Sequence, residues 1–293
     1  MHCGFVALIG APNAGKSTLL NKMAGAKLSI VSPKAQTTRM RILGIVMRQQ
    51  TQILLMDTPG IFKPKRKLDE AMVAAAWTGA VDADITLLLI DANLGLTDEN
   101  RDIINHLKEN SRRIWLVFNK IDKINPQKLL PLTEEITSML SIEKSFMVSA
   151  KTGSGVDDLL DSLAEELPKG PWLYPEDDLT NLPDRLLAAE LVREQIFMQT
   201  HEEVPYSVTA ETESFKERPD GSVRIDVTIY VLRANHKAII IGDKGQKIRM
   251  IGERARKELS RLLDRNCHLF LIVKERKGWD SETARLKAIG LED

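Results

Sequence analysis

The sequence predicts an α/β domain followed by a smaller α+β domain. Residues 1–170 alternate short apolar runs with segments of helical spacing, which is typical of a mostly parallel sheet covered by helices. The segment 167–183 has four prolines, a glycine and an acidic cluster, so it interrupts that alternation. Beyond it, helical and alternating segments follow in a different order. We therefore expect one domain at 1–172, a linker at 173–182 and a second domain at 183–293.

Composition is that of an ordinary globular protein. The 293 residues are 28% charged and 43% apolar, and apolar runs such as Leu87–Ile90 are far too short to span a bilayer. The first ten residues, MHCGFVALIG, lack the pattern of a signal peptide, and we expect them to form a buried strand. The two cysteines, Cys3 and Cys267, have no metal-site spacing and fit a reducing cytosol.

Positive and negative charges balance over the whole chain, but in the second domain they are concentrated in separate segments. The net charge is zero, with 41 basic and 41 acidic residues. Residues 237–261 contain eight Lys or Arg and three acidic residues, whereas residues 202–226 contain seven acidic and three basic residues. The second domain could therefore present one cationic face to a nucleic acid. Two ordinary solvated surfaces would explain the same counts.

In the first domain each expected strand ends at a polar motif. Ligands of such sheets bind at the carboxyl ends of the strands, so these motifs should meet at one edge. The expected strands are GFVALIG, TQILLMD, ADITLLLIDA, RRIWLVFNK and EKSFMVSA, and the clearest helices are KSTLLNKMAG and VDDLLDSLAEEL.

The second domain reads as helix, strand, strand, helix, loop, helix, strand. A helical segment, PDRLLAAELVREQIFMQT, comes first. Two alternating strands follow, YSVTAETESF and SVRIDVTIYVL, joined through the turn signal KERPDG. Next come the apolar HKAIII, the loop GDKG, the basic helix QKIRMIGERARKELSRLLD and the strand CHLFLIVKER.

The stretch GAPNAGKS at 10–17 fits the phosphate-binding pattern G-x-x-x-x-G-K-[ST]. Its glycines allow backbone N–H groups to wrap phosphates at a helix N-terminus. Lys16 would reach the β- and γ-phosphates, and Ser17 would place a hydroxyl on Mg²⁺. The context is right, because an apolar strand precedes the loop and a helix follows it.

Three further motifs follow later strands. DTPG at 57–60 would place Asp57 near Mg²⁺ and the Gly60 N–H at the γ-phosphate. NKID at 119–122 would select guanine, because the Asp122 carboxylate can accept two hydrogen bonds that adenine cannot donate. SAK at 149–151 would touch the guanine O6 through a backbone N–H. Each motif is weak alone, but four in this order are very specific.

These four motifs make the first domain resemble the translation-factor-related P-loop GTPases. The resemblance implies GTP/GDP and Mg²⁺ as cofactors, and Mg²⁺ ligands Ser17, Asp57 and a threonine of the loop SPKAQTTRMR at 32–41. We favour Thr38 for that threonine, with Thr37 as the alternative. Lys16, Thr38 and Gly60 are the expected catalytic groups. The expected nucleotide-binding residues are Gly10, Ala11, Pro12, Asn13, Ala14, Gly15, Lys16, Ser17, Thr18, Asp57, Thr58, Pro59, Gly60, Asn119, Lys120, Asp122, Ser149, Ala150 and Lys151.

One position departs from many small GTPases. Those proteins have a glutamine after the D-x-x-G glycine, where it orients the attacking water, and this chain has Ile61. An aliphatic side chain cannot orient water. We therefore expect slow hydrolysis by the chain alone, or the use of another group, a backbone contact, a bound cation or a partner. The basic FKPKRK at 62–67 is either a solvated mobile segment or a contact for RNA or ribosome.

The loop GDKG at 242–245 fits a G-x-x-G pattern that is common by chance, but the segments around it make the match more specific. An Ile-rich segment precedes it, a basic amphipathic helix follows it with Ile251 and Ala255 at core spacing, and the element order is that of a type II KH domain. In that fold a groove beside the loop holds about four nucleotides. A helix–turn–helix with a glycine cap is the alternative. The expected RNA-binding residues are Ile241, Gly242, Asp243, Lys244, Gly245, Lys247 and Ile248.

A P-loop GTPase domain followed by one type II KH domain resembles the Era-type GTPases over essentially the whole chain. The resemblance implies a cytoplasmic, monomeric protein that binds the single-stranded 3′ end of 16S ribosomal RNA and acts in 30S subunit assembly. It also implies peripheral association with the cytoplasmic face of the inner membrane, which no segment of this sequence indicates. Two other functions remain open at this stage: constitutive RNA binding with a structural nucleotide, and a KH-like domain that binds protein or membrane.

Overall fold

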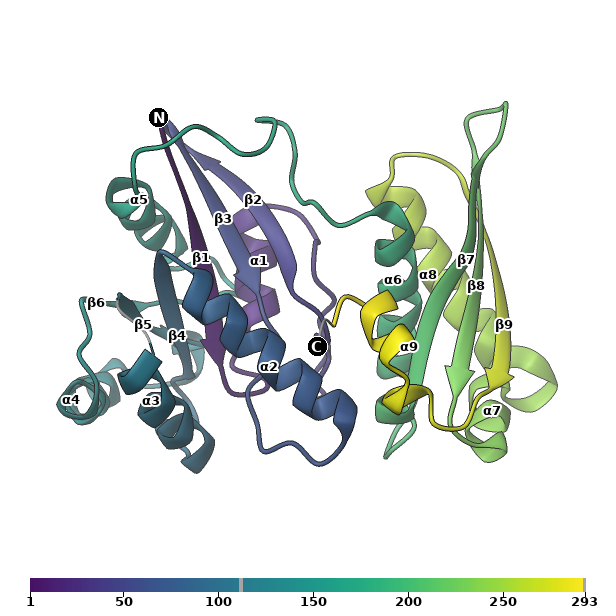
Figure 1. The fold of residues 1–293 in the computed structure, drawn as a ribbon, viewed down its shortest axis with the longest axis horizontal. Helices are drawn as coiled ribbons and strands as arrows, with labels where there is room; N and C mark the ends of the chain where they lie inside the picture. Colours follow the sequence, from purple (N-terminus) through teal and green to yellow (C-terminus); the bar gives the residue numbers. More distant parts are fainter. Residues whose placement is uncertain (111–112, 292–293) are drawn as a thin grey trace. The chain divides into compact units, whose positions relative to one another are not determined.

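The computed structural model describes residues 1–110 and 113–291, which fold into two units (Figure 1). The first unit comprises residues 1–65 and 69–181, and the second comprises residues 66–68 and the chain from residue 182 onward. Each unit contains one sheet. The predicted succession of an α/β and an α+β fold is confirmed.

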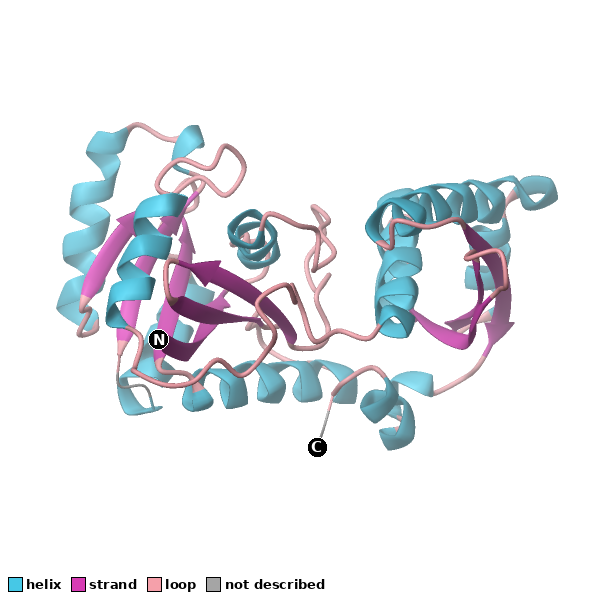
Figure 2. Ribbon diagram, turned by 90° about the horizontal axis from the view of Figure 1, so that it is seen from above, coloured by secondary structure: helices cyan, strands magenta, loops and turns pink. Residues whose placement is uncertain are grey.

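The sheet of the first unit has the strand order β2-β3-β1-β4-β5-β6. Every neighbouring pair is parallel except β2 with β3, so the prediction of a mostly parallel sheet is confirmed (Figure 2). The strands span β1 His2–Gly10, β2 Ile42–Arg48, β3 Thr51–Asp57, β4 Ile85–Asp91, β5 Ile114–Asn119 and β6 Lys144–Met147.

The strand β2 is absent from the sequence-based expectations. It forms an antiparallel hairpin with β3, and Gln49 in the connection has a φ of 54°. Five consecutive residues of β2 are buried, so the segment does not alternate as a half-exposed strand would. The turn also lacks the Asn-Gly or Asp-Gly pair that marks most two-residue hairpins. Both usual signals are therefore missing.

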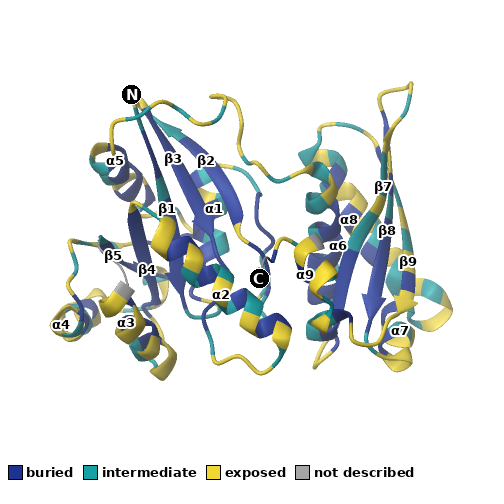
Figure 3. Ribbon diagram, viewed as in Figure 1, coloured by how far each residue is buried: buried dark blue, intermediate teal, exposed yellow. Residues whose placement is uncertain are grey.

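Helices cover both faces of this sheet. Two of them, α1 at Lys16–Ala24 and α5 at Val156–Glu166, pack on one face. Residues of α2 at Lys67–Asp82, α3 at Asp98–Asn110 and α4 at Leu129–Met139 share a hydrophobic core with the other face. The strands β1 to β5 are almost entirely buried between the two layers, whereas the edge strand β6 is only partly covered (Figure 3). This burial fixes the strands whose carboxyl ends carry the motifs.

The predicted linker packs along the hairpin before the second unit begins. The Ile45 N–H donates to the Leu179 carbonyl at 2.8 Å, and the Thr180 hydroxyl donates to the Leu43 carbonyl at 2.6 Å. Nearer its start, the Leu173 N–H donates to Gln52 Oε1 at 2.8 Å. The segment 173–180 is therefore held by one backbone and one side-chain hydrogen bond to the main chain of β2, and by the Gln52 side chain of β3.

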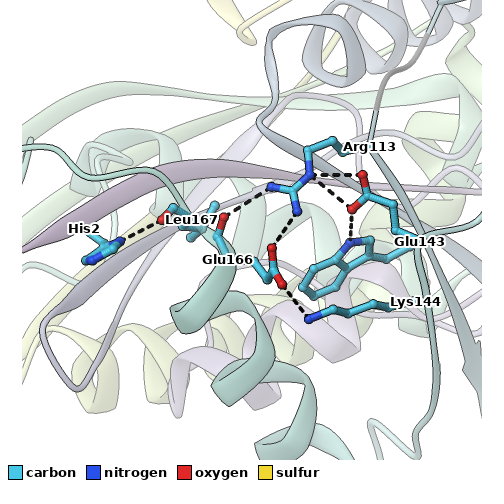
Figure 4. A network of polar contacts seen from close by, with 7 residues as sticks. His2, Arg113, Glu143, Lys144, Glu166 and Leu167 are labelled. Atoms are coloured by element: carbon cyan, nitrogen blue, oxygen red, sulfur yellow. Dashed lines mark hydrogen bonds and ion pairs between the residues drawn. The ribbon is translucent and has the colours of Figure 1, made fainter.

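A polar network ties the amino ends of β5 and β6 to the end of α5 (Figure 4). The Arg113 guanidinium donates to the carboxylates of Glu143, at 3.1 Å, and Glu166, at 2.9 Å. Lys144 donates to Glu166 at 2.9 Å, and the indole N–H of Trp115 donates to Glu143 at 3.1 Å. The hydrogen bonds from Lys144 and Arg113 lower the pKa of Glu166. Because the network lies at the amino ends, it is structural and remote from the motifs.

The second unit has the predicted order, including the helix before the GDKG loop. Its sheet order is β7-β8-β9, with β7 and β8 antiparallel and β8 and β9 parallel. Among the described residues, none of the helices in either unit has the length and apolarity needed to cross a bilayer. The elements are α6 Asp184–Gln199, β7 Val208–Glu217, β8 Val223–Val231, α7 Ala234–Ile241, α8 Gln246–Leu262, β9 Cys267–Glu275 and α9 Thr283–Ala288.

Candidate functional site

The carboxyl ends of four neighbouring strands place the polar motifs at one edge of the first sheet. Gly10 ends β1, Asp57 ends β3, Asp91 ends β4 and Asn119 ends β5. The loop after β1 runs directly into α1, so its backbone N–H groups lie at a helix N-terminus. Gly15 has a φ of 96°, and a Cβ there would lie 2.2 Å from Asn119 Nδ2, so glycine is required.

The Lys16 ammonium is held beneath this loop. Its Nζ donates to the carbonyls of Gly10 at 3.0 Å and Ala11 at 3.1 Å. Burial lowers the pKa of Lys16 from 10.5 to about 8, and the nearby Asp57 carboxylate opposes this lowering only in part. An anionic phosphate at this loop would favour the charged ammonium. A bound phosphate would therefore stabilise the charged form of Lys16.

Three oxygen-bearing side chains converge beside Lys16. The hydroxyl oxygens of Ser17 and Thr38 lie 2.8 Å apart, and the Thr38 hydroxyl lies 3.5 Å from Asp57 Oδ2. The hydroxyl of Ser29, which the sequence did not single out, donates to the same Asp57 oxygen at 2.8 Å. The Thr37 hydroxyl instead donates to the Lys34 carbonyl at 2.8 Å. The geometry thus favours Thr38 over Thr37.

The chemistry of this cluster fits a hard divalent cation. Asp57 is fully buried, and its Oδ1 has no hydrogen-bond partner within the described residues. Burial accordingly raises the pKa of Asp57. A buried carboxylate oxygen without a donor is stabilised by a cation, and Mg²⁺ prefers oxygen ligands of this kind. The predicted Mg²⁺ ligands are therefore suitable in type and close together.

The turn after Asp57 passes against the phosphate loop. A Cβ on Gly60 would lie 2.9 Å from Pro12 Cα, so only glycine permits this approach. The Thr58 hydroxyl donates to the Leu8 carbonyl at 2.7 Å and is fully buried, which makes that side chain structural. Ile61 donates its N–H to the Gly10 carbonyl at 3.2 Å, and its side chain packs in the core. An Ile61 side chain in the core has no access to an attacking water.

The NKID loop is braced against the phosphate loop. The Asn119 amide donates to the Ala14 carbonyl at 2.9 Å, and its oxygen accepts the Ala150 N–H at 3.0 Å. Lys120 Nζ donates to the Asn13 carbonyl and to Asp91 Oδ2, both at 2.6 Å. One asparagine and one lysine therefore connect three of the four motifs.

The structure brings Asp122 to the SAK motif. The Ser149 hydroxyl donates to Asp122 Oδ1 at 2.7 Å. This hydrogen bond lowers the pKa of Asp122, with Lys151 and Lys123 contributing, so the carboxylate is ionised and accepts hydrogen bonds at neutral pH. An ionised carboxylate at this place has the chemistry required to bind the N1–H and the amine of guanine.

A cavity of about 420 Å³ occupies the phosphate end of this site. Asp57, Asp122, Ser149, Ala150 and Lys151 do not line it. Nine of the predicted nucleotide-binding residues or Mg²⁺ ligands line the cavity, namely Pro12, Asn13, Gly15, Lys16, Ser17, Thr18, Thr38, Gly60 and Lys120. The lining also includes Ser32, Pro33, Lys34 and Gln36 of the loop 32–41, which the sequence placed here as a segment. The sequence did not indicate Ile30, Val31, Asp91, Leu94 and Lys123, and of these only Asp91, at a strand end, carried a recognisable signal.

In the second unit the GDKG loop has a backbone that requires glycine. Gly242 has φ 71° and ψ 178°, and a Cβ there would lie 2.7 Å from the Lys247 Cβ. Gly245 has a φ of 76°, and the exposed Lys244 between them has a φ of 46°. The loop therefore turns tightly from α7 into α8 and exposes a lysine at its tip. Asp243 is exposed beside it, whereas Ile241 and Lys247 are half-buried.

A groove of about 490 Å³ runs between α8 and β9, directly after this loop. Ile248 lines it, whereas Ile251 and Ala255 on the other face of α8 are buried in the core. The remaining lining residues were not identified from the sequence and comprise Arg249, Gly252, Glu253, Arg256, His268, Leu269, Phe270 and Leu271. Basic and apolar side chains on an open groove suit the phosphates and bases of a single strand.

Two family models match the chain. Residues 5–120 match a family described as 50S ribosome-binding GTPase, and residues 203–280 match the KH domain. These ranges contain the phosphate loop and the GDKG loop, respectively. The predicted GTPase and KH folds are thus found by comparison as well as by geometry.

Full-length relatives are also found. The chain is 53% identical to GTPase Era of Mesorhizobium japonicum, with 99% of this chain and 94% of the relative covered. It is 49% identical to GTPase Era of Brucella suis, with 99% and 93% covered.

Two solved structures resemble the whole chain. One is a variant of Aquifex aeolicus Era bound to GDP and AlF4⁻, with 41% identity, a TM-score of 0.95 and full coverage of both chains. The other is Era in complex with MgGDPNP and nucleotides 1506–1542 of 16S ribosomal RNA, with 41% identity, a TM-score of 0.94 and full coverage.

Proposed function

This chain belongs to the Era family of GTPases, and from that premise we propose that it is a GTP-hydrolysing switch that binds the 3′ region of 16S ribosomal RNA through its KH domain. The RNA-bound relative, which matches this chain over its full length, supports the choice of RNA. The observation that carries the proposal here is the Gly242–Gly245 loop, which leads into α8, the helix whose residues Ile248, Arg249 and Arg256 line the groove against β9.

We propose the following roles for the residues around the nucleotide. Lys16 holds the β- and γ-phosphates, and Gly60 directs its N–H to the γ-phosphate. Ser17, Thr38 and Asp57 hold Mg²⁺, which when bound neutralises phosphate charge. The Thr38 hydroxyl lies 2.8 Å from the Ser17 hydroxyl and 3.5 Å from Asp57 Oδ2, which supports this ligand set.

Base selection is proposed to rest on Asp122. Its carboxylate accepts from guanine, and Ser149 orients it through the 2.7 Å hydrogen bond. Asp122 is exposed in the structure, and a bound base would cover its carboxylate from water. An adenine base would then leave this acceptor without its donors, which is unfavourable. Asn119 and Lys120 keep the loop in place.

Turnover by the chain alone is proposed to be slow. The side chain of Ile61 is only 7% exposed and packs in the core, so it leaves the attacking water without an orienting group. An outside group would then raise the rate, and RNA bound to the second unit is the first candidate. We propose in addition that the GTP-bound and GDP-bound forms differ in RNA affinity, in which case RNA favours one nucleotide over the other by the same factor.

The proposed setting is assembly and maturation of the small (30S) ribosomal subunit in the cytoplasm. We propose a monomeric protein for this role. Peripheral association with the cell membrane remains a prediction from the family resemblance.

The test is GTP turnover with and without a single-stranded RNA that matches the 3′ end of 16S ribosomal RNA, with a scrambled RNA as control. Stimulation by the matching strand alone supports the switch. Salt-sensitive RNA binding without any effect on turnover would favour a constitutive RNA binder instead. Absence of binding would mean that the second unit recognises protein or membrane.

A further inference from the structure

Ser29, in the loop between α1 and β2, makes a short hydrogen bond to a candidate Mg²⁺ ligand. Its hydroxyl donates to Asp57 Oδ2 at 2.8 Å, and the side chain is only 1% exposed. The Thr38 hydroxyl lies 3.5 Å from the same oxygen. Of these two hydroxyl groups, Ser29 therefore makes the closer contact with the Asp57 carboxylate, although it belongs to none of the four motifs.

The Asp57 carboxylate needs such a contact to keep one orientation. Rotation of an aspartate carboxylate about its Cβ–Cγ bond has broad minima, so the backbone alone does not fix the positions of the two oxygens. Asp57 is fully buried, and its Oδ1 has no hydrogen-bond partner in the described part of the chain. A short hydrogen bond to Oδ2 restricts this rotation, and it therefore also determines where Oδ1 lies.

Ser29 is itself held by Asn21 of α1. Asn21 Oδ1 accepts the N–H groups of Leu28 and Ser29, both at 2.9 Å, and Asn21 Nδ2 donates to the Ser29 carbonyl at 2.7 Å. Asn21 is four positions after Ser17, so the two side chains lie on the same face of α1. One helix thus carries a candidate Mg²⁺ ligand and, one turn later, the anchor of the residue that contacts another ligand.

The anchoring of Ser29 differs from that of Thr38. Switch loops of GTPases are ordered by contacts with the γ-phosphate and Mg²⁺ and are released on hydrolysis. Thr38 belongs to the loop 32–41, so we expect it to leave the metal when the γ-phosphate is lost. The three hydrogen bonds between Asn21 and the 28–29 main chain involve neither nucleotide nor metal. We therefore expect Ser29 to keep its place in both nucleotide states.

We propose that Ser29 is a positioning residue of the Mg²⁺ site, which orients the Asp57 carboxylate with GDP bound as well as with GTP bound. Asn21 acts through Ser29 by fixing its main chain. Groups that orient a metal ligand by a hydrogen bond typically change metal affinity about 10- to 100-fold. This inference rests on the proposed function, because it takes Ser17, Thr38 and Asp57 as the groups that hold Mg²⁺.

The experiment measures metal affinity directly, with Mn²⁺ as the spectroscopic substitute for Mg²⁺. The full chain is loaded with GDP or with a non-hydrolysable GTP analogue, and free Mn²⁺ is followed by electron paramagnetic resonance during a titration. We expect Ser29→Ala to weaken Mn²⁺ binding at least about ten-fold in both complexes. Thr38→Ala should weaken it with the GTP analogue alone. Unchanged affinity in the Ser29 variant, or a loss confined to the GTP analogue, would overturn the proposal.

Thr51→Val is the control for the loss of a buried hydroxyl. Thr51 begins β3, at the opposite end from Asp57, and its hydroxyl donates to the Ala164 carbonyl at 3.0 Å. The side chain is only 3% exposed. We expect this variant to be destabilised in denaturant unfolding but to bind Mn²⁺ as the unchanged chain does. Equal weakening of Mn²⁺ binding by Thr51→Val and Ser29→Ala would mean that general destabilisation is the cause, and would contradict the proposal.

Asn21→Ala tests how Ser29 is held. The substitution alone should weaken Mn²⁺ binding, because the main chain at Ser29 loses its anchor. In the Ser29→Ala background it should weaken binding by less than about two-fold, because residues that act through one another are not additive. Full additivity of the two effects would contradict the action of Asn21 through Ser29.

The results also separate this inference from the proposed function. If Ser17→Ala weakens Mn²⁺ binding and Ser29→Ala does not, the proposed metal site is supported and the role of Ser29 is wrong. If Ser29→Ala weakens Mn²⁺ binding in both complexes but RNA leaves GTP turnover unchanged, the role of Ser29 is correct and the proposed coupling to RNA is wrong.

Discussion

The hydroxyl oxygen of Thr38 lies 2.8 Å from that of Ser17, although Ser17 is in the first turn of α1 and Thr38 is in the loop before β2. Thr37, the adjacent residue with the same side chain, directs its hydroxyl to the Lys34 carbonyl. The loop 32–41 therefore presents its two threonines in different directions. Only Thr38 contributes an oxygen to the cluster around Asp57.

We expect Thr38→Ala to lower GTP hydrolysis and Mg²⁺ affinity about ten- to hundred-fold, the range typical of groups that hold or orient metal ligands. Thr37→Ala is the matched control and should change either quantity by less than about three-fold. Single-turnover hydrolysis over a range of Mg²⁺ concentrations measures both effects. A larger defect in the Thr37 variant would reverse the assignment of the ligand.

The Asp122 carboxylate is expected to select guanine. In Asp122→Asn an amide replaces the pair of acceptors, and one of the two hydrogen bonds to the base is lost. Hydrogen bonds to charged groups contribute about 1.5–3 kcal/mol, so GTP affinity should fall roughly 10- to 150-fold. Competition against a fluorescent GTP analogue measures this fall.

The companion measurement for Asp122→Asn uses xanthosine triphosphate, whose base carries an oxygen where guanine has its amine. The variant amide can donate to that oxygen, so we expect the preference between the two nucleotides to shift toward xanthosine. RNA binding should be unaffected. Unchanged affinity for both nucleotides would remove Asp122 from the base site.

Much of the geometry of the candidate nucleotide site could be predicted, because its residues follow recognisable strands. The four motifs stand at the carboxyl ends of β1, β3, β5 and β6, where parallel strands must bring them together. Ser29 shows the limit of this reasoning. It bonds Asp57 at 2.8 Å but precedes the unpredicted strand β2, in a segment with no strand-end signal.

The second unit shows the same contrast. The order of its elements could be predicted from the local sequence pattern. The role of the loop glycines could be predicted because glycine allows backbone conformations that other residues rarely adopt. The lining of the groove could not be predicted from the sequence, because its walls come from α8 and β9 together. Phe270 and Arg256 lie fourteen positions apart in sequence and line one groove only after the chain folds.

Ile61 yields a prediction about stability as well as activity. Its side chain is 7% exposed within the core, so Ile61→Gln would bury an amide without partners or expel it. We expect a loss of about 1–3 kcal/mol in the free energy of unfolding and no gain in unstimulated GTP turnover. Ile61→Leu, the apolar control, should lose less than about 1.5 kcal/mol. Faster turnover in the glutamine variant would show that this side chain can reach the water.

Arg113 should stabilise the first unit in a pH-dependent way. It bonds both Glu143 and Glu166. Burial alone would raise the pKa of Glu143, but the hydrogen bonds from Arg113 and Trp115 outweigh it, and the pKa values of both carboxyls lie below the usual 4.5. Carboxyls of lowered pKa stabilise the fold fully above 4.5, and that stabilisation is lost as the pH falls through their folded values.

Arg113→Met should therefore lose about 1 kcal/mol of unfolding free energy at neutral pH, since the network is partly exposed and screened. The deficit should shrink as the pH falls below 4.5. Denaturant unfolding at several pH values measures this trend. Arg101→Met, which removes a single exposed pair with Glu135, is the control and should lose less. A deficit that persists undiminished in acid would mean that Arg113 acts through packing.

Substitutions in the GDKG loop should affect RNA binding without affecting GTP binding. Gly242 has a φ of 71°, and a Cβ there would lie 2.7 Å from that of Lys247, so Gly242→Asp should distort the loop and place a negative charge beside the groove. RNA affinity should fall at least about ten-fold while GTP affinity stays unchanged. Gly221→Asp is the control, because Gly221 also has a positive φ of 79° but no neighbour within 4 Å of its added Cβ.

Lys244 allows the same region to be tested without backbone strain. The side chain is exposed, so Lys244→Ala should leave the fold intact and remove one phosphate contact. Each phosphate contact changes the slope of log affinity against log salt by about 0.7 for single strands, so the slope should become shallower by about that amount. Fluorescence anisotropy with a labelled RNA at several salt concentrations measures this slope. A weaker affinity with an unchanged slope would mean that Lys244 supports the loop and does not contact the RNA backbone.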